Sequence, residues 1–243
     1  MEALTETYSF NLGRSFERRL TDQSRLLYTG TIGGQRFHRF NGLSNVQVGV
    51  EAEYQYRESA EFSEPTWGVF GKLNAEEFES RLRDGYRLSV GLSVRLPLTD
   101  RIGAFAAVAH NVRNARSEVF STRDNAVRGN IDYALSNRET IYFGSELRVG
   151  DIVSTGRASL ENVTIAKMFV QDDAYAGGQM FSYKVDGRTW LLTVGYNLSF
   201  GARDSIDFSW RNVRATPGLR PSFVTGPRSY RANQLSAVYL LRF

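Results

Sequence analysis

The amino-acid sequence predicts an all-β chain that forms a single antiparallel transmembrane β-barrel of about twelve strands. Three observations carry this prediction: apolar residues alternate with polar ones at a period of two, charged residues share the polar faces, and short connections alternate with long ones. The 243 residues are 13% aromatic, with 22 Gly and only 5 Pro, a composition that favours strands and turns over helices.

Eleven segments are expected to be strands. Ten of them show this alternation, most clearly at 45–56, whereas RIGAFAAVAH at 101–110 is small and apolar on both faces. In NVQVGVEAEYQY, every second residue from Val46 to Tyr56 is apolar or aromatic, whereas Glu51 and Glu53 lie on the opposite face. A helical period would mix the two sets. In chain order the expected strands cover 7–16, 24–34, 45–56, 66–73, 85–98, 101–110, 130–136, 140–149, 190–200, 205–211 and 235–243.

Connections of two lengths alternate between these strands. Short polar turns occur at RLTDQS, PLTDR, LSNRE and FGARDS, and long segments are expected at about 34–44, 112–127, 149–188 and 212–230. This asymmetry is typical of a transmembrane barrel with short periplasmic turns and long extracellular loops. All five prolines are expected in turns or loops, because proline cannot donate to a strand ladder.

An odd number of strands is unusual for a closed single-chain barrel. A strand hidden within 150–188 is the preferred explanation, because it makes twelve and moves the N-terminus to the periplasmic end. A turn assigned to the wrong side and an upstream strand outside this sequence are the alternatives. In hydrocarbon every backbone N–H and C=O group needs a partner, so we expect the last strand to pair with the first.

The apolar stripes are expected to face lipid. Mean hydropathy is −0.35, and no run approaches the roughly 20 apolar residues of a membrane helix. A soluble barrel of this size would enclose more space than the stripes could fill. The opposite faces would then line a wet lumen and determine its selectivity, through Lys72, Arg87, Arg95, Arg128, Arg148, Arg211, Glu51, Glu53, Asp132, Glu146 and Asp207.

The segment LSAVYLLRF resembles the C-terminal signal of bacterial outer-membrane β-barrel proteins. It is an alternating strand that ends in phenylalanine, with Leu235, Ala237, Tyr239, Leu241 and Phe243 on one face. The resemblance is specific here and general elsewhere in the chain. It implies a Gram-negative outer membrane, contact with its lipid and lipopolysaccharide, and assembly by the barrel-assembly machinery.

Residues suited to catalysis or metal binding are few. There is no Cys, and the two histidines, His38 and His110, lack a serine motif. Paired acids occur at Asp172 and Asp173 and again in NAEEFES, but acids in loops are commonly just solvated. A net charge of +4 is spread over 30 basic and 26 acidic residues, which argues against nucleic acid. We therefore expect no catalytic residue, metal or cofactor.

Residues 1–243 are expected to form one barrel domain, for which three functions are considered. A pore for small hydrophilic solutes is preferred, with anions as the candidate class, because rings of charge select ions in pores. The same charges could equally pair with one another and hold a narrow barrel rigid, and segment 149–188 is long enough to plug the mouth. An interaction or assembly barrel, such as the membrane part of an export system, is the alternative, and an outer-membrane hydrolase comes third.

Overall fold

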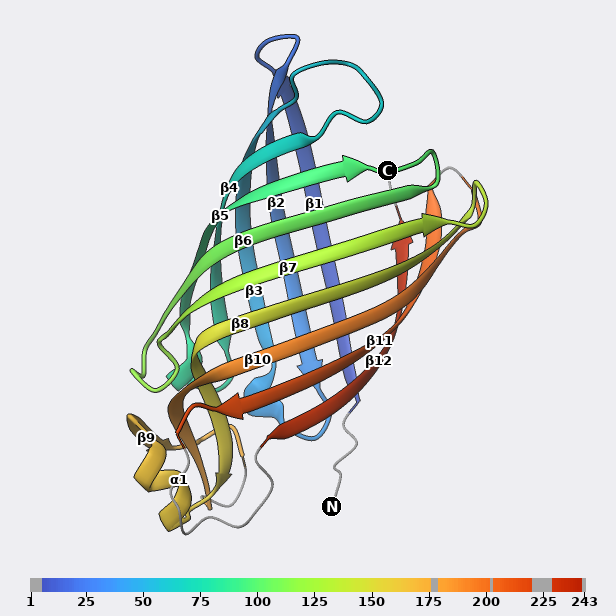
Figure 1. Cartoon of the computed structure of the whole chain (residues 1–243). Coiled ribbons are helices and arrows are strands. Elements are labelled where there is room, and N and C mark those ends of the chain that lie inside the picture. Colours follow the sequence, from blue (N-terminus) through green and yellow to red (C-terminus); the bar gives the residue numbers. More distant parts are fainter. Residues whose placement is uncertain (1–5, 176–178, 202, 220–228, 242–243) are drawn as a thin grey trace.

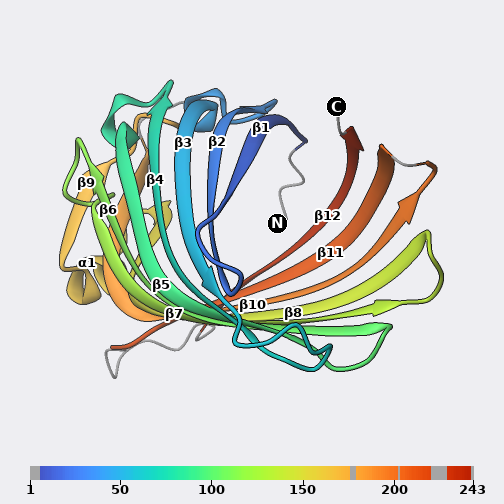
Figure 2. The ribbon, with the colours of Figure 1, turned by 90° about the horizontal axis from the view of Figure 1, so that it is seen from above.

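The computed structural model describes residues 6–175, 179–201, 203–219 and 229–241. One antiparallel sheet of twelve strands bends into an incomplete barrel (Figure 1, Figure 2). The strands are β1 (Thr7–Arg19), β2 (Ser24–Phe37), β3 (Asn45–Tyr56), β4 (Thr66–Phe78), β5 (Gly85–Pro97), β6 (Ile102–Ala115), β7 (Thr122–Ala134), β8 (Glu139–Arg157), β9 (Met168–Gln171), β10 (Met180–Ser199), β11 (Asp204–Pro217) and β12 (Tyr230–Leu241). The short helical segments are η1 (Asn41–Leu43), η2 (Arg81–Arg83) and α1 (Leu160–Ile165).

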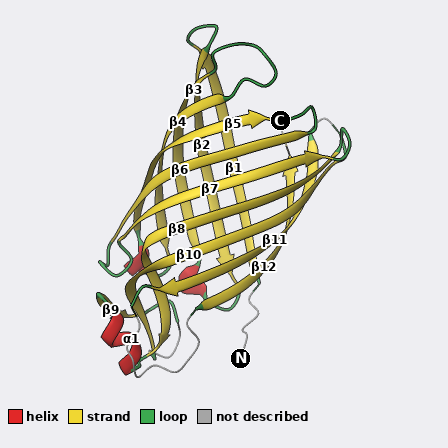
Figure 3. Ribbon diagram, viewed as in Figure 1, coloured by secondary structure: helices red, strands yellow, loops and turns green. Residues whose placement is uncertain are grey.

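The sheet follows the order of the chain, which confirms the predicted antiparallel β architecture. Each strand from β1 to β8 pairs with the next, and the path continues through β10, β11 and β12. The helical segments all lie at one end of the sheet (Figure 3), together with the connections β2–β3, β4–β5, β6–β7, β8–β10 and β11–β12. We call this the long-loop end and the opposite end the short-turn end. No helix in the described part of the chain is long and apolar enough to cross a membrane.

The apolar stripes predicted from the sequence lie on the outer, convex face. On adjacent strands β4 to β7 they form a row of directly opposed residues, in which Val69, Leu92, Val108 and Val127 are each about half exposed or more. No other element among the described residues covers this row. Successive side chains of a strand point to opposite faces, so a polarity period of two gives each strand one apolar and one polar face.

The long loops are shorter than the sequence predicted. The strands continue past the end of the clear alternation, so the connections shrink to 38–44, 116–121, 158–179 and 218–229. The hairpin of β8 and β10 is the extreme case, with strands of 19 and 20 residues. Toward the long-loop end, both faces of this hairpin are polar or partly covered. The alternation of apolar and polar residues on which the sequence prediction relied is therefore absent there. The expectation that all five prolines lie in turns or loops is wrong for Pro97 and Pro217, which are the last residues of their strands. Pro65 precedes β4, whereas Pro221 and Pro227 lie outside the described residues.

The twelfth strand lies inside 150–188 as predicted, but it is much shorter than a membrane-spanning strand. β9 has four residues and pairs only with β10, at the long-loop end. Four residues span about 13 Å, too little for an apolar belt of roughly 25 Å. The prediction that a hidden strand moves the N-terminus to the short-turn end is therefore wrong: β1 begins at the long-loop end and β12 ends at the short-turn end (Figure 1).

The first and last strands are the two edges of the described sheet. No pairing joins β1 to β12 among the described residues, and Figure 2 shows a gap between them. Closure thus stays a prediction. Of the five residues expected to form the assembly signal, Leu235, Ala237, Tyr239 and Leu241 lie in β12, whereas Phe243 lies outside the described residues.

Candidate functional site: the charged concave face and the loops above it

All eleven predicted lumen residues lie on the concave face. Each occupies the strand face opposite to the exposed apolar stripe, as Arg87 does between exposed Tyr86 and Leu88. Contacts between strands that are not neighbours confirm that this face is concave, because side chains converge only there. Glu53 of β3 reaches Arg95 of β5, with Oε1 and Nη1 2.7 Å apart.

Carboxylates on the same face neutralise four of the predicted cations. Arg95 holds Glu53 with two hydrogen bonds, which Ser93 supplements at 3.0 Å. Lys72 lies 3.7 Å from Glu51, and Arg148 binds Glu146. The fourth cation is Arg87, whose guanidinium lies 3.5 Å from Glu76.

The sequence prediction missed Glu76 and Arg113, which form an ion pair of 3.0 Å on the same face. Glu76 was grouped with the loop acids of NAEEFES, yet it lies within β4. The sequence does contain a pattern that places Glu76 on this face, because Lys72, Asn74 and Glu76 are polar at every second position. The acids at 76 and 77 are thus not a catalytic pair, because neighbouring residues of a strand point to opposite faces.

Two predicted cations have no carboxylate partner within ion-pair distance in the described residues. Arg128 lies over the rings of Phe70 and Phe105, at 5.5 Å and 5.2 Å from their centroids. Arg211 forms no ion pair with a described residue. Of the predicted acids, Asp132 accepts a hydrogen bond from Asn130, and Asp207 accepts one from Tyr142 across the concave face.

The glycine of β4 at position 68 creates the space for the Glu53 pair. A Cβ atom there would lie 2.3 Å from the Ser93 hydroxyl oxygen and 2.6 Å from Glu53 Oε1. Gly68→Ala should therefore displace the carboxylate and lower the free energy of unfolding by about 1–3 kcal/mol. Gly71→Ala on the same strand is the control, because a Cβ atom there meets nothing within 4 Å. Urea titration of both variants in lipid checks this; equal stability of the two variants would contradict it.

Asp172 and Arg83 join the long β8–β10 connection to the β4–β5 loop. Arg83 donates two hydrogen bonds to Asp172, of 2.7 Å and 2.5 Å, and both side chains are buried. Ser182 donates a third at 2.6 Å. The Arg83 guanidinium also lies 4.1 Å from the ring centroid of Phe120, in the β6–β7 loop. We call the Arg83–Asp172 pair the latch.

The latch shifts the pKa of Asp172. Burial by itself raises the pKa of this carboxyl, but the hydrogen bonds from Arg83 and Ser182 outweigh burial, and the net pKa lies below its ordinary value. Asp172 therefore stays ionised at neutral pH. A buried, paired carboxylate of this kind is a structural group and not a base facing a substrate.

Residues next to Asp172 contact the β4–β5 loop a second time and also contact the β2–β3 connection. The hydroxyl of Ser80 donates to Asp173, and the ring of Tyr175 lies 5.1 Å from that of Phe40 in the β2–β3 connection. Gly42 packs so closely on Ala174 that a Cβ atom would lie 2.4 Å from its Cα atom. The tip of the β9–β10 hairpin thus bridges the long-loop end, from β8–β10 to β2–β3.

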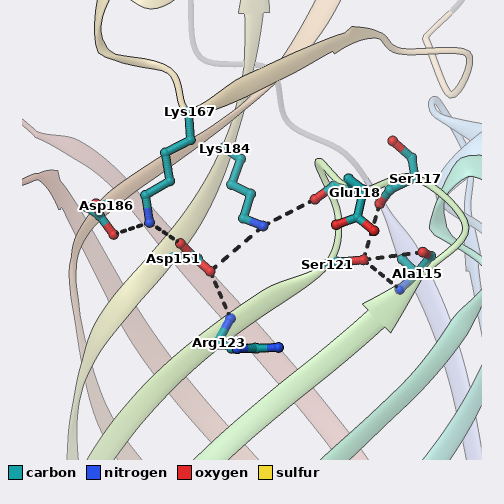
Figure 4. A network of polar contacts seen from close by, with 9 residues as sticks. All are labelled: Ala115, Ser117, Glu118, Ser121, Arg123, Asp151, Lys167, Lys184 and Asp186. Atoms are coloured by element: carbon teal, nitrogen blue, oxygen red, sulfur yellow. Dashed lines mark hydrogen bonds and ion pairs between the residues drawn. The ribbon is translucent and has the colours of Figure 1, made fainter.

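A second cluster holds the base of the same connection (Figure 4). Lys167 Nζ lies 2.8 Å from Asp151 and 2.6 Å from Asp186. Lys184 lies 3.9 Å from Asp151 and donates to the Glu118 carbonyl oxygen at 3.3 Å. The connection is therefore held at its base and at its tip.

The histidines lie apart from these clusters. His110 is exposed on the convex face, where Nδ1 lies 2.9 Å from Asn125 Oδ1, and His38 is in the β2–β3 connection. Within the described ranges no three His, Asp or Glu side chains are placed to hold a metal ion.

No protein-family model and no curated protein sequence matches the chain. Among solved structures, the chain is similar to one described as "KdgM porin", with 13% identity and a TM-score of 0.43 over 85% of this chain and 91% of that chain. A likeness of this size identifies neither a family nor a solute. The functional argument therefore depends on the geometry of the chain itself. This is an antiparallel sheet with an apolar convex face and a charged concave face, as the resemblance to outer-membrane β-barrels implied.

Proposed function

We propose that residues 1–243 form one transmembrane β-barrel domain of the bacterial outer membrane, and that the barrel is a pore for small hydrophilic solutes. The observation that carries this is the reversed distribution of polarity. A soluble barrel buries its apolar stripe, whereas here the convex face exposes it and the concave face holds the ion pairs.

The height of the apolar stripe fits a bilayer. The convex face is apolar or aromatic from Trp190 on β10 to Phe200, the residue that follows β10, and both of these rings are exposed. Ten residue steps along a strand tilted by about 45° cover roughly 23 Å, close to the roughly 25 Å apolar band of an outer-membrane barrel. Aromatic rings at the two ends suit the lipid–water boundaries.

Contact with outer-membrane lipid and lipopolysaccharide follows from this location. Assembly by the barrel-assembly machinery also belongs to the proposal, and the alternating convex face of β12 supports it through Leu235, Tyr239 and Leu241.

Selectivity is proposed to depend on Arg128 and Arg211. The other predicted cations have a carboxylate within ion-pair distance, so their fields partly cancel. Neither Arg128 nor Arg211 has one among the described residues, since Glu146, which lies opposite Arg128 in the register, binds Arg148. A net positive field in the lumen favours anions. The latched β8–β10 connection, which bridges the loops at the long-loop end, is proposed to narrow the mouth.

Planar-bilayer conductance tests the proposal. Arg128→Ala and Arg211→Ala remove charge without leaving an unpaired carboxylate, so the reversal potential in a salt gradient should shift toward cations. Arg101→Ala in the exposed β5–β6 turn is the control and should leave the reversal potential unchanged. Silent bilayers with heat-modifiable, folded protein would argue against a pore.

One observation favours the assembly barrel as a second candidate. β1 and β12 are unpaired edges of the described sheet, and free edges can pair with a strand of another polypeptide. This function would be favoured over a pore if a strand-donating partner co-purified with the chain and planar bilayers showed no conductance.

A further inference from the structure

The convex face of β11 and β12 changes character stepwise toward the long-loop end. Directly opposed pairs run from Ile206 and Tyr239, through Phe208 and Ala237, to Trp210 and Leu235. The next pair is Asn212 and Asn233, joined by a hydrogen bond of 2.8 Å, and the last is Arg214 and Arg231. In a membrane, the boundary between hydrocarbon and headgroups would therefore fall between the Trp210–Leu235 pair and the asparagine pair.

Arg214 and Arg231 are exposed cations in direct opposition. Directly opposed residues have Cβ atoms about 5 Å apart, and like charges in this arrangement destabilise a sheet. Arg188 adds a third guanidinium nearby. Trp190 of β10 is directly opposed to Arg214, and Arg188 lies two residues before Trp190 on the same face. All three side chains are exposed on the convex face. We call Arg188, Arg214 and Arg231 the arginine triad.

No carboxylate of the described residues neutralises the triad. The nearest on this face is Asp186, two residues before Arg188, and Lys167 already binds it at 2.6 Å. The convex positions of β11 and β12 carry no acid between Ile206 and Thr216 or between Arg231 and Leu241. Three adjacent positive charges without a protein partner are stable where an anion lies between them.

We propose that the arginine triad binds the phosphate groups of a lipid in the leaflet at the long-loop end. Guanidinium groups match phosphate oxygens with two parallel hydrogen bonds. Arg214 and Arg231 form the second residue pair beyond Trp210 and Leu235, the last apolar pair. A bound lipid would therefore contact Trp210 and Leu235 with its acyl chains and place its headgroup at the level of the guanidinium groups. This inference rests on the proposed membrane location, and it is independent of whether the barrel conducts.

Native mass spectrometry of the refolded chain in neutral detergent, with added diphosphoryl lipid A, tests the site. The doubly substituted chain, Arg214→Gln with Arg231→Gln, should bind about a hundred-fold more weakly, because two charge-assisted contacts are lost. Arg18→Gln is the matched control, an exposed convex arginine at the short-turn end of β1, and it should leave binding unchanged.

Each other outcome overturns the proposal. Equal binding by the double variant, or an equal loss in Arg18→Gln, would show general attraction to charge. Displacement of the lipid by millimolar inorganic phosphate would show an anion site without lipid specificity. Conductance measured on the same samples separates the two proposals, because unchanged channels with no lipid binding remove the lipid site alone. A chain that stays soluble without detergent would remove both.

Discussion

Arg83→Ala should release the tip of the β9–β10 hairpin and expose the β8–β10 connection to protease. The substitution leaves the Asp172 carboxylate buried without its guanidinium partner. Breaking a buried ion pair from one side costs about 3–5 kcal/mol, and 3 kcal/mol raises the population of the open loop by about a hundred-fold. Lys167 is the single Lys or Arg between 158 and 179, so the rate of trypsin cleavage after Lys167 measures the opening.

Arg83→Met combined with Asp172→Leu is the matched control. Replacing both partners leaves no unpaired charge, and such replacements are often neutral. The double variant should therefore be cut far more slowly than Arg83→Ala. Equal cleavage of the wild-type chain and Arg83→Ala would show that the latch does not hold the connection.

The latch should also respond to acid in one direction. The folded pKa of Asp172 lies below its ordinary value, so its stabilising contribution is complete above the unfolded pKa of about 3.9 and is lost as pH falls through the folded pKa. Cleavage by an acid-active protease should thus stay slow near pH 5 and accelerate below about pH 4. In Asp172→Asn this acceleration should be absent.

Leu92→Lys should destabilise the membrane-inserted chain strongly. Leu92 lies in the apolar row of the convex face and is 57% exposed. A lysine facing lipid near the middle of an outer-membrane barrel costs roughly 2–4 kcal/mol. Asn130→Lys is the matched change on the concave face, where Asp132 accepts a hydrogen bond from Asn130 and could pair with the new cation. Denaturant titration in liposomes should therefore separate the two variants; a larger loss in Asn130→Lys would reverse the assignment of the faces.

The faces of the strands were predictable from the sequence because a period of two is a local property. Alternate residues from Val46 to Tyr56 identify the apolar, convex side of β3 without any knowledge of its neighbours. The same logic placed all eleven charged residues on one face. It failed at the long-loop end, where β8 continues past Val149 and β10 begins before Arg188, because residues there such as Tyr183 and Val185 are covered by the protein and no longer alternate between two different surroundings.

Partners within the site could not be predicted, because they depend on register and curvature. Glu53 and Arg95 are 42 residues apart and sit on strands separated by β4. Arg83 and Asp172 are 89 residues apart and meet only through loop packing. The sequence shows an acid pair at Asp172 and Asp173 but not its partner, and burial against Arg83 gives Asp172 a structural role.

Cysteine labelling along β5 tests the membrane assignment most directly, because the chain contains no native Cys. Single cysteines at Leu88, Val90 and Leu92 should carry nitroxide labels that a lipid-soluble relaxing agent reaches, whereas labels at Arg87, Ser89 and Ser93 should respond to a water-soluble agent. We predict strict alternation between the two agents. Water access on both faces, or a monodisperse chain in buffer without detergent, would contradict a convex face in lipid and a concave face around water.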